Sequence, residues 1–120
     1  MAITTANFAN TKRWPLAAGR WGFRTTFTGP SSYTSGGEPL TNALCLAALG
    51  LTRVDSVQCS PIAGNSFAND SSLSFDHNAV SGSSQGKFHI YDQTGTNTGT
   101  EVVATTNYGT FTALLSGFGS

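Results

Sequence analysis

Apolar and polar positions alternate with a period of two in several short stretches of the chain. In residues 19–29, one parity carries three aromatic residues and a threonine: Trp21, Phe23, Thr25 and Phe27. The other parity carries Arg24 and Thr26. Because successive side chains of a β-strand point to opposite faces, this alternation predicts a strand with one apolar face.

Weaker alternation predicts further strands along the chain. Residues 51–59 alternate only in part, with Val54 and Val57 apolar and Arg53 and Asp55 polar, and they are also predicted to form a strand. Residues 73–80 and 87–93 flank a Gly/Ser-rich turn at 81–86, which predicts a β-hairpin. Its inward side chains are Leu73, Phe75, Phe88 and Ile90, with Lys87, His89 and Tyr91 outward. One or two final strands are expected in residues 101–119, with Val103, Phe111, Ala113 and Leu115 on the apolar face. Loops are expected at 61–72, which contains Phe67, and at 94–100.

The least polar run of the chain follows a Gly-Gly turn and reads EPLTNALCLAALGL, residues 38–51. Pro39 suits the first turn of a helix, and Gly50 suits the position just past a helix end. A short, largely buried helix is therefore predicted, with Leu40 and Leu44 on one side. A buried strand stays an alternative, because short apolar runs fit both.

The N-terminal 18 residues show no strong period, and Pro15 limits any helix there. We expect an extended arm over residues 1–18, with room for a short strand, followed by a single β-domain over residues 19–120. Strands and helices do not alternate along the chain, so the fold class is all-β. The prediction is a compact sandwich or barrel of about five to seven short strands with one short helix.

The composition narrows the class of protein. Charged residues make up 10% of the 120 residues, and the formal net charge is zero. No apolar run approaches the roughly 18 residues that a membrane helix requires, so no membrane association is expected. The basic pair Lys12–Arg13 follows the apolar N-terminal residues, the reverse of a secretory signal, and synthesis in the cytoplasm is expected. Cys45 and Cys59 are expected to be small buried apolar residues rather than a disulfide or zinc ligands.

No catalytic constellation emerges from the sequence. The two histidines, His77 and His89, have neighbouring acids, but no nucleophile motif accompanies them. The six acidic residues are scattered along the chain, and no phosphate-binding loop or calcium loop is present. We therefore expect no enzyme activity, no catalytic residues, no cofactor and no metal.

Basic residues are concentrated near the N-terminus. Four of the six basic residues lie between positions 12 and 24, and no acidic residue precedes Glu38. This segment also contains both tryptophans, and its basic and tryptophan residues are Lys12, Arg13, Trp14, Arg20, Trp21 and Arg24. Three readings fit: a solvated strand face with one core tryptophan, a protein interface, or a nucleic-acid surface. A neutral chain with six basic residues lacks the charge expected of a nucleic-acid binder, so no nucleic acid is expected.

The order of these segments resembles small virion proteins of tailed bacteriophages, of the head-decoration or capsid-cement type. The resemblance covers roughly residues 19–119. It lies in FRTTFTG followed by SSYTSGGEPLT, a helix-like stretch that ends in LGL, LTRVDSVQ, SFDHN, GKFHIYD and the terminal EVVATTNYGTFTALLSGFG.

The resemblance implies a non-catalytic β-domain on the outer surface of the virion capsid, where it binds and stabilises the lattice of the major capsid protein. It also implies a homo-oligomer, a trimer or a dimer. The expected lattice or inter-subunit contacts are Lys12, Arg13, Trp14, Arg20 and Trp21. The alternatives are another virion component, such as a tail, neck or head-fiber base protein, or a carbohydrate- or host-surface-binding β-module that uses Tyr33, Tyr91 and Tyr108.

Overall fold

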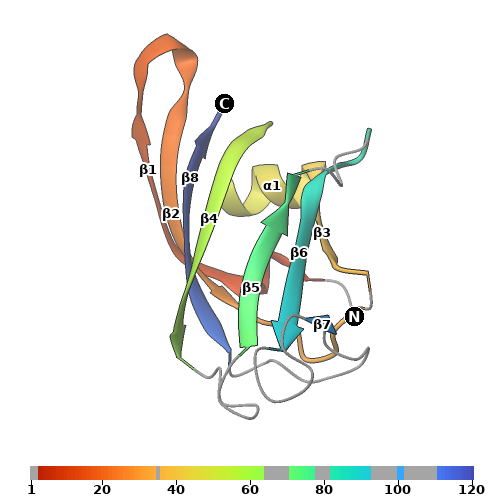
Figure 1. Cartoon of the computed structure of the whole chain (residues 1–120). Coiled ribbons are helices and arrows are strands. Elements are labelled where there is room, and N and C mark those ends of the chain that lie inside the picture. Colours follow the sequence, from red (N-terminus) through yellow and green to blue (C-terminus); the bar gives the residue numbers. More distant parts are fainter. Residues whose placement is uncertain (1–2, 35, 64–70, 78–81, 93–99, 102–110) are drawn as a thin grey trace.

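The computed structural model of the chain describes residues 3–34, 36–63, 71–77, 82–92, 100–101 and 111–120. Two antiparallel β-sheets pack face to face in a sandwich, with one short α-helix (Figure 1). The predicted all-β sandwich is confirmed. The predicted positions of Phe67, Val80, Val103 and Tyr108 lie outside the described residues.

The first sheet has four strands in the order β1-β2-β8-β4. They are β1 (Phe8–Pro15), β2 (Trp21–Thr28), β8 (Thr112–Gly119) and β4 (Val54–Ala63). The second sheet has the order β3-β6-β5, and a short strand, β7, pairs with β6. These strands are β3 (Glu38–Thr41), β6 (Ser84–Asp92), β5 (Ser71–Asp76) and β7 (Thr100–Glu101).

The N-terminal segment is part of the sandwich, and the predicted extended arm is not confirmed. Residues Phe8–Pro15 form edge strand β1, antiparallel to β2, after a 3₁₀ turn at Thr5–Asn7. The register shifts between Ala9 and Lys12, where Asn10 has a φ of 56°. This bulge, together with the exposure of most side chains of β1, removes the period of two that would have revealed the strand.

The single α-helix, α1 (Asn42–Leu49), confirms the predicted short helix over the alternative strand. Thr41 is the N-cap, since its Oγ1 accepts from the amide of Leu44, and Gly50 ends the helix in the left-handed region at φ 70°. The expected place of Pro39 in the first helical turn is wrong: Pro39 lies in β3. The helix contacts β1, β3 and β6, and so covers the side of the sandwich between edge strands β1 and β3.

Strand β4 contains a bulge that explains its partial alternation. Val54 pairs with Gly119 and Ser56 with Phe118, so Asp55 is an extra residue in this strand. Val54 and Val57 are consequently both buried although they are three positions apart.

The predicted hairpin is confirmed, with shifted boundaries. Strands β5 and β6 pair antiparallel, with Leu73 opposite Ile90 and Phe75 opposite Phe88. The connection lies earlier in the chain than predicted, because β5 already ends at Asp76 and β6 begins at Ser84. The predicted 61–72 loop is too long, because β4 extends to Ala63 and β5 begins at Ser71.

The core lies between the sheets. The inward parity of β2 is confirmed, since Phe23, Thr25 and Phe27 are buried. Phe27 stacks on Phe88 of the second sheet with ring centroids 5.1 Å apart, which joins the two layers. The other buried apolar residues are Ile3, Phe8, Tyr33, Leu40, Leu44, Cys45, Leu49, Leu51, Val54, Val57, Leu73, Ile90, Phe111, Ala113 and Leu115. Among the described residues, no helix is long and apolar enough to cross a membrane.

Candidate functional site

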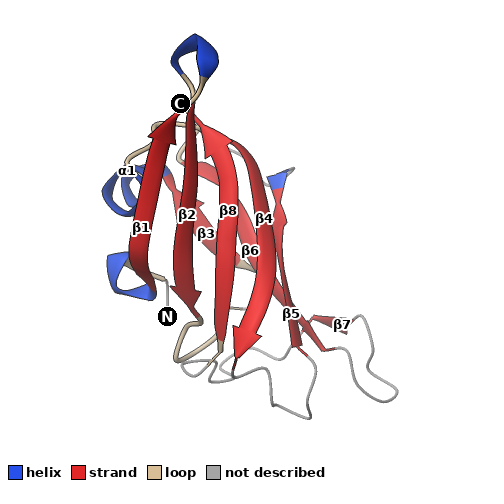
Figure 2. Cartoon of the chain, turned by 90° about the vertical axis from the view of Figure 1, so that its left-hand side faces the viewer, coloured by secondary structure: helices blue, strands red, loops and turns tan. Residues whose placement is uncertain are grey.

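The first sheet has one face in the core and one face that no described helix or strand covers (Figure 2). Because the inward parity of β2 is buried, the alternate residues of β2 and their cross-strand partners face away from the core. We call this surface the outer face. It is formed by Lys12, Trp14, Gly22, Arg24, Thr26, Leu114, Ser116, Phe118, Ser56 and Gln58.

An aromatic row crosses the outer face near the end of the sheet where β1 turns into β2. Trp14 of β1 is opposite Gly22 of β2, and Gly22 is opposite Phe118 of β8. A Cβ at Gly22 would overlap the indole of Trp14, so the absent side chain of Gly22 leaves the space that the ring occupies. Trp14 remains 44% exposed, which is a large apolar surface for a side chain in solvent.

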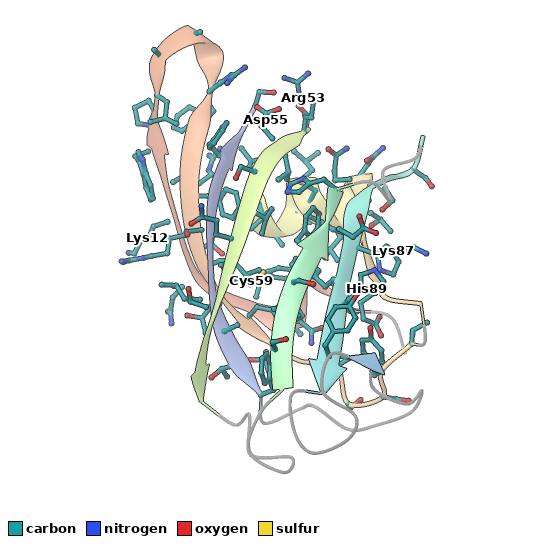
Figure 3. All side chains as sticks on the ribbon, viewed as in Figure 1. Lys12, Arg53, Asp55, Cys59, Lys87 and His89 are labelled. Carbon is teal, nitrogen blue, oxygen red and sulfur yellow. The ribbon has the colours of Figure 1, made fainter. Side chains whose placement is uncertain are left out.

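A basic row runs parallel to the aromatic row, and each of its positions lies two residues away from the aromatic row along the same strand. Lys12 is opposite Arg24, and Arg24 is opposite Ser116. Both cationic side chains are exposed, and Lys12 points away from the sheet (Figure 3). Within the described part of the chain, neither forms a salt bridge. Like charges directly across a strand pair are unfavourable, so this pairing does not stabilise the sheet.

The hairpin that joins β1 and β2 projects beyond the other strands (Figure 1). Its tip is a 3₁₀ turn at Ala17–Gly19, closed by the amide of Leu16, which donates to the carbonyl of Arg20 at 2.8 Å. Ala18 has a φ of 62°, a left-handed conformation that costs free energy in a residue other than glycine. Leu16, two residues beyond Trp14, is also 44% exposed, so the tip carries a second exposed apolar side chain.

On the opposite side of the β1–β2 hairpin, Arg13 connects the hairpin to the end of α1. The Arg13 guanidinium lies 4.8 Å from the centre of the Trp21 ring, and its Nη1 donates to the carbonyl of Gly50 at 3.1 Å. Gly50 ends α1, where the helix dipole favours a cation. Arg13 and Trp21 therefore position the hairpin.

Three charged residues meet beside the aromatic row. Asp55 Oδ1 lies 3.2 Å from Nε of Arg53, and Asp55 Oδ2 lies 3.8 Å from Nε of Arg20. The longer distance is an electrostatic contact rather than a hydrogen bond. The Arg20 guanidinium also lies 5.9 Å from the centre of the Phe118 ring. Asp55 thus partly neutralises Arg20, whereas Lys12 and Arg24 keep their full charge.

The five contact residues expected from the sequence fall into two groups. Lys12 and Trp14 belong to the outer face, and Arg20 flanks it through Phe118. Arg13 and Trp21 lie on the other side of the hairpin. The expected set lacked three residues of the outer face. Arg24 could have been found from the sequence, because it alternates with Phe23 and so points to the solvent side of the strand. Phe118 and Leu114 could not, because they reach the face only through the pairing of β8 with β2.

The remaining candidate groups lie elsewhere. Tyr33 is buried, and its hydroxyl accepts from the amide of Ile90 at 3.2 Å, so it is not available as a surface platform. His89 Nε2 lies 3.8 Å from Asp76 Oδ2, and the His89 ring stacks on Tyr91 on the second sheet. Within the described ranges, no group of three or more His, Cys, Asp and Glu side chains is placed to hold a metal ion.

Both cysteines are free thiols, with Cys45 buried and Cys59 half-buried. Burial raises the pKa of Cys45 from 9.0 to about 11 and the pKa of Cys59 from 9.0 to about 12. Because the thiolate is the nucleophilic form, both side chains are poor nucleophiles near neutral pH.

No known protein-family profile, curated protein or solved structure matches the chain. The strongest candidate for a functional site is the outer face with its projecting hairpin, because the exposed Trp14 and Leu16 and the basic row lie there.

Proposed function

We propose that the protein is a structural virion component of the decoration type, which binds the outer surface of an assembled phage capsid and stabilises the lattice of the major capsid protein. The segment order of residues 19–119 supports this class. The single observation that carries the proposal is the outer face, where an aromatic row with the exposed Trp14 and a basic row lie side by side on the first sheet.

The chemistry of the outer face suits contact with a protein. Tryptophan and arginine dominate the binding energy of protein interfaces, and Trp14 and Arg24 lie in adjacent rows here. A rigid sheet loses little conformational entropy on docking, and the aromatic row and the exposed Leu16 add apolar area. The projecting hairpin is shaped to reach a second subunit of the lattice, or a second copy of this chain in a dimer or trimer.

Binding of this kind stabilises a capsid by mass action. A ligand that binds the assembled lattice and not the free subunits shifts the equilibrium toward assembly by RT ln(1 + [L]/Kd). Repeated copies on a regular lattice, or an oligomer with several binding faces, raise the effective affinity without new kinds of contact. No chemical step is required of the protein.

The test is co-sedimentation with expanded capsids prepared from the phage that encodes the chain, stripped of this protein. The wild-type chain should pellet with the capsids to saturation and raise the temperature at which they release DNA. The double variant Trp14→Ala/Leu16→Ala should lose at least tenfold in affinity. A matched control is Leu46→Ala, which removes an exposed apolar side chain from α1 instead.

Absence of wild-type binding to the capsids would refute the decoration function. Binding to defined glycans on an array, in a monomeric protein that does not pellet with capsids, would establish the carbohydrate-binding alternative. Equal capsid binding by wild type and Trp14→Ala/Leu16→Ala would keep the function but move the interface away from the hairpin.

A further inference from the structure

We infer that Lys12 and Arg24 form a carboxylate-binding element, and that the partner presents aspartate or glutamate side chains to the outer face. This inference rests on the proposed function for the identity of the partner, and on the geometry of the basic row for its chemistry. The outer face then has a specific charge requirement in addition to its apolar contacts.

The two cations of the basic row repel each other. Lys12 and Arg24 are direct cross-strand partners, so their Cβ atoms are about 5 Å apart. The three salt bridges among the described residues involve neither of them. An arrangement that costs the isolated sheet free energy becomes favourable once a carboxylate lies between the two charges. One carboxylate has two oxygens and can accept from both side chains at this spacing.

Charged residues are distributed unevenly over the two sheets. The chain is neutral, but four of its six basic residues lie on β1, β2 or the hairpin between them. Among the described acids, Asp55 is the only one in the first sheet, and Glu38, Asp76, Asp92 and Glu101 all belong to strands of the second sheet. Figure 3 shows Lys12 on the side of the molecule opposite Lys87 and His89. Of the four basic residues, Lys12 and Arg24 belong to the outer face, which therefore complements an acidic surface.

The basic row lies between apolar neighbours. The aromatic row of Trp14 and Phe118 borders it on one side, and Leu114, beside Thr26, borders it on the other. A partner that covers these side chains excludes water from the basic row, and ionic hydrogen bonds are stronger in the lower dielectric that results. A carboxylate fits better than a nucleic-acid backbone, because strong binding to a phosphate backbone needs more cations than the two unpaired ones here.

The experiment uses the full chain and hexaglutamate as the probe, with a dodecathymidine oligonucleotide as the phosphate comparison. Amide resonances of Lys12, Arg24 and Ser116 should shift on titration with hexaglutamate, and the shifts should disappear at about 0.5 M salt because the contact is ionic. The variant Lys12→Gln/Arg24→Gln should weaken this binding at least tenfold. The matched control is Lys87→Gln, which removes a cation from β6 of the second sheet and should bind as wild type does. The single variants Lys12→Gln and Arg24→Gln, which remove the same amount of charge from the basic row, are compared with it. Thermal unfolding verifies that all variants are folded.

Unchanged affinity in Lys12→Gln/Arg24→Gln, or shifts confined to the second sheet, would overturn the inference. Tighter binding of the oligonucleotide than of hexaglutamate at the same ionic strength would overturn it in favour of phosphate. The capsid assay separates the two proposals. If wild type and Lys12→Gln/Arg24→Gln pellet equally with capsids, the carboxylate element is wrong and the decoration function stands. If wild type does not pellet, the decoration function fails, and the hexaglutamate titration still decides the chemistry of the basic row.

Discussion

The indole of Trp14 occupies the space that a side chain at Gly22, its cross-strand partner, would fill. Gly22 is buried although it lies on the solvent-facing parity of β2, because the indole covers it. Its φ is outside the left-handed region, so the glycine is required by the close approach of the ring and not by the backbone conformation. The pair holds a large aromatic ring against the sheet while 44% of the residue remains exposed.

Substitution of Gly22 by alanine is expected to displace the Trp14 indole and leave the fold intact. The three atoms nearest to the new methyl group all belong to the Trp14 indole, an exposed ring that can rotate away, so the free energy of unfolding should change by less than about 1 kcal/mol. The indole N–H resonance of Trp14 should shift in NMR spectra, whereas the resonance of Trp21 should not. Capsid affinity should fall about tenfold as the ring loses its fixed orientation. An unmoved Trp14 resonance would contradict the packing described here.

Gly117 of β8 is expected to respond differently to the same change. A Cβ at Gly117 would overlap the carbonyl oxygen of Ser56 on β4, and this backbone cannot move without breaking the pairing of β4 with β8. Gly117→Ala should therefore lower the free energy of unfolding by roughly 2 kcal/mol or more. The matched control is Gly82→Ala, since nothing lies within 4 Å of its new methyl group. Urea denaturation of the two variants gives the comparison, and similar midpoints would show that β4 has room to shift.

The sequence was sufficient for the elements whose side chains divide cleanly between core and solvent. Strand β2 was predicted because Phe23 and Phe27 bury one face while Arg24 stays in water. The end of α1 was predicted at Gly50 because the left-handed conformation there favours glycine. In both places, local chemistry and tertiary packing demand the same residues.

Where tertiary context decides, the sequence was insufficient. Strand β1 lies at an edge with a bulge at Asn10, so its pattern carries no period of two. Pro39 fits a helix start as well as a short strand, and only the pairing with Lys87 selects the strand. The candidate site was the part least predictable from the sequence, because Phe118 joins Trp14 and Arg24 only through the register of β8 on β2. Such long-range pairing leaves no signal in a local pattern of residues.

The buried thiol of Cys45 is expected to make stability depend on pH in the alkaline range. Its pKa is raised from 9.0 to about 11 in the folded chain, so the folded state keeps a proton that the unfolded chain releases. The stabilisation is complete below pH 9 and is lost as the pH rises through about 11. The slope in this window approaches about 1.4 kcal/mol per pH unit for one fully buried thiol.

Urea midpoints at pH 8, 9, 10 and 11 should therefore fall more steeply for wild type than for Cys45→Ala. The comparison uses slopes, because the alanine variant also loses packing at every pH. Native protein at pH 8 should also react with a disulfide reagent far more slowly than unfolded protein. Equal slopes in the two proteins, or equal thiol reactivity in the folded and unfolded states, would contradict the burial of this thiol.

Removal of the Asp55 carboxylate is expected to strengthen binding to an acidic partner at little cost in stability. The Arg20 and Arg53 side chains that it contacts are 50% and 61% exposed, and ion pairs of such exposure contribute less than about 1 kcal/mol. Asp55→Ala leaves Arg20 unneutralised beside the aromatic row. Association with hexaglutamate and with capsids should become faster at low salt, and the gain should vanish near 0.5 M salt because steering by charge is screened.

The matched control for this prediction is Asp76→Ala, which removes one acid from the second sheet, where it contacts His89. Both variants change the net charge by the same amount, so a gain caused by net charge alone would appear in both. A gain confined to Asp55→Ala places the charge requirement on the outer face beside Lys12 and Arg24. Equal gains in the two variants would show that attraction is global, and no gain in either would show that the partner surface carries no acidic field toward this face.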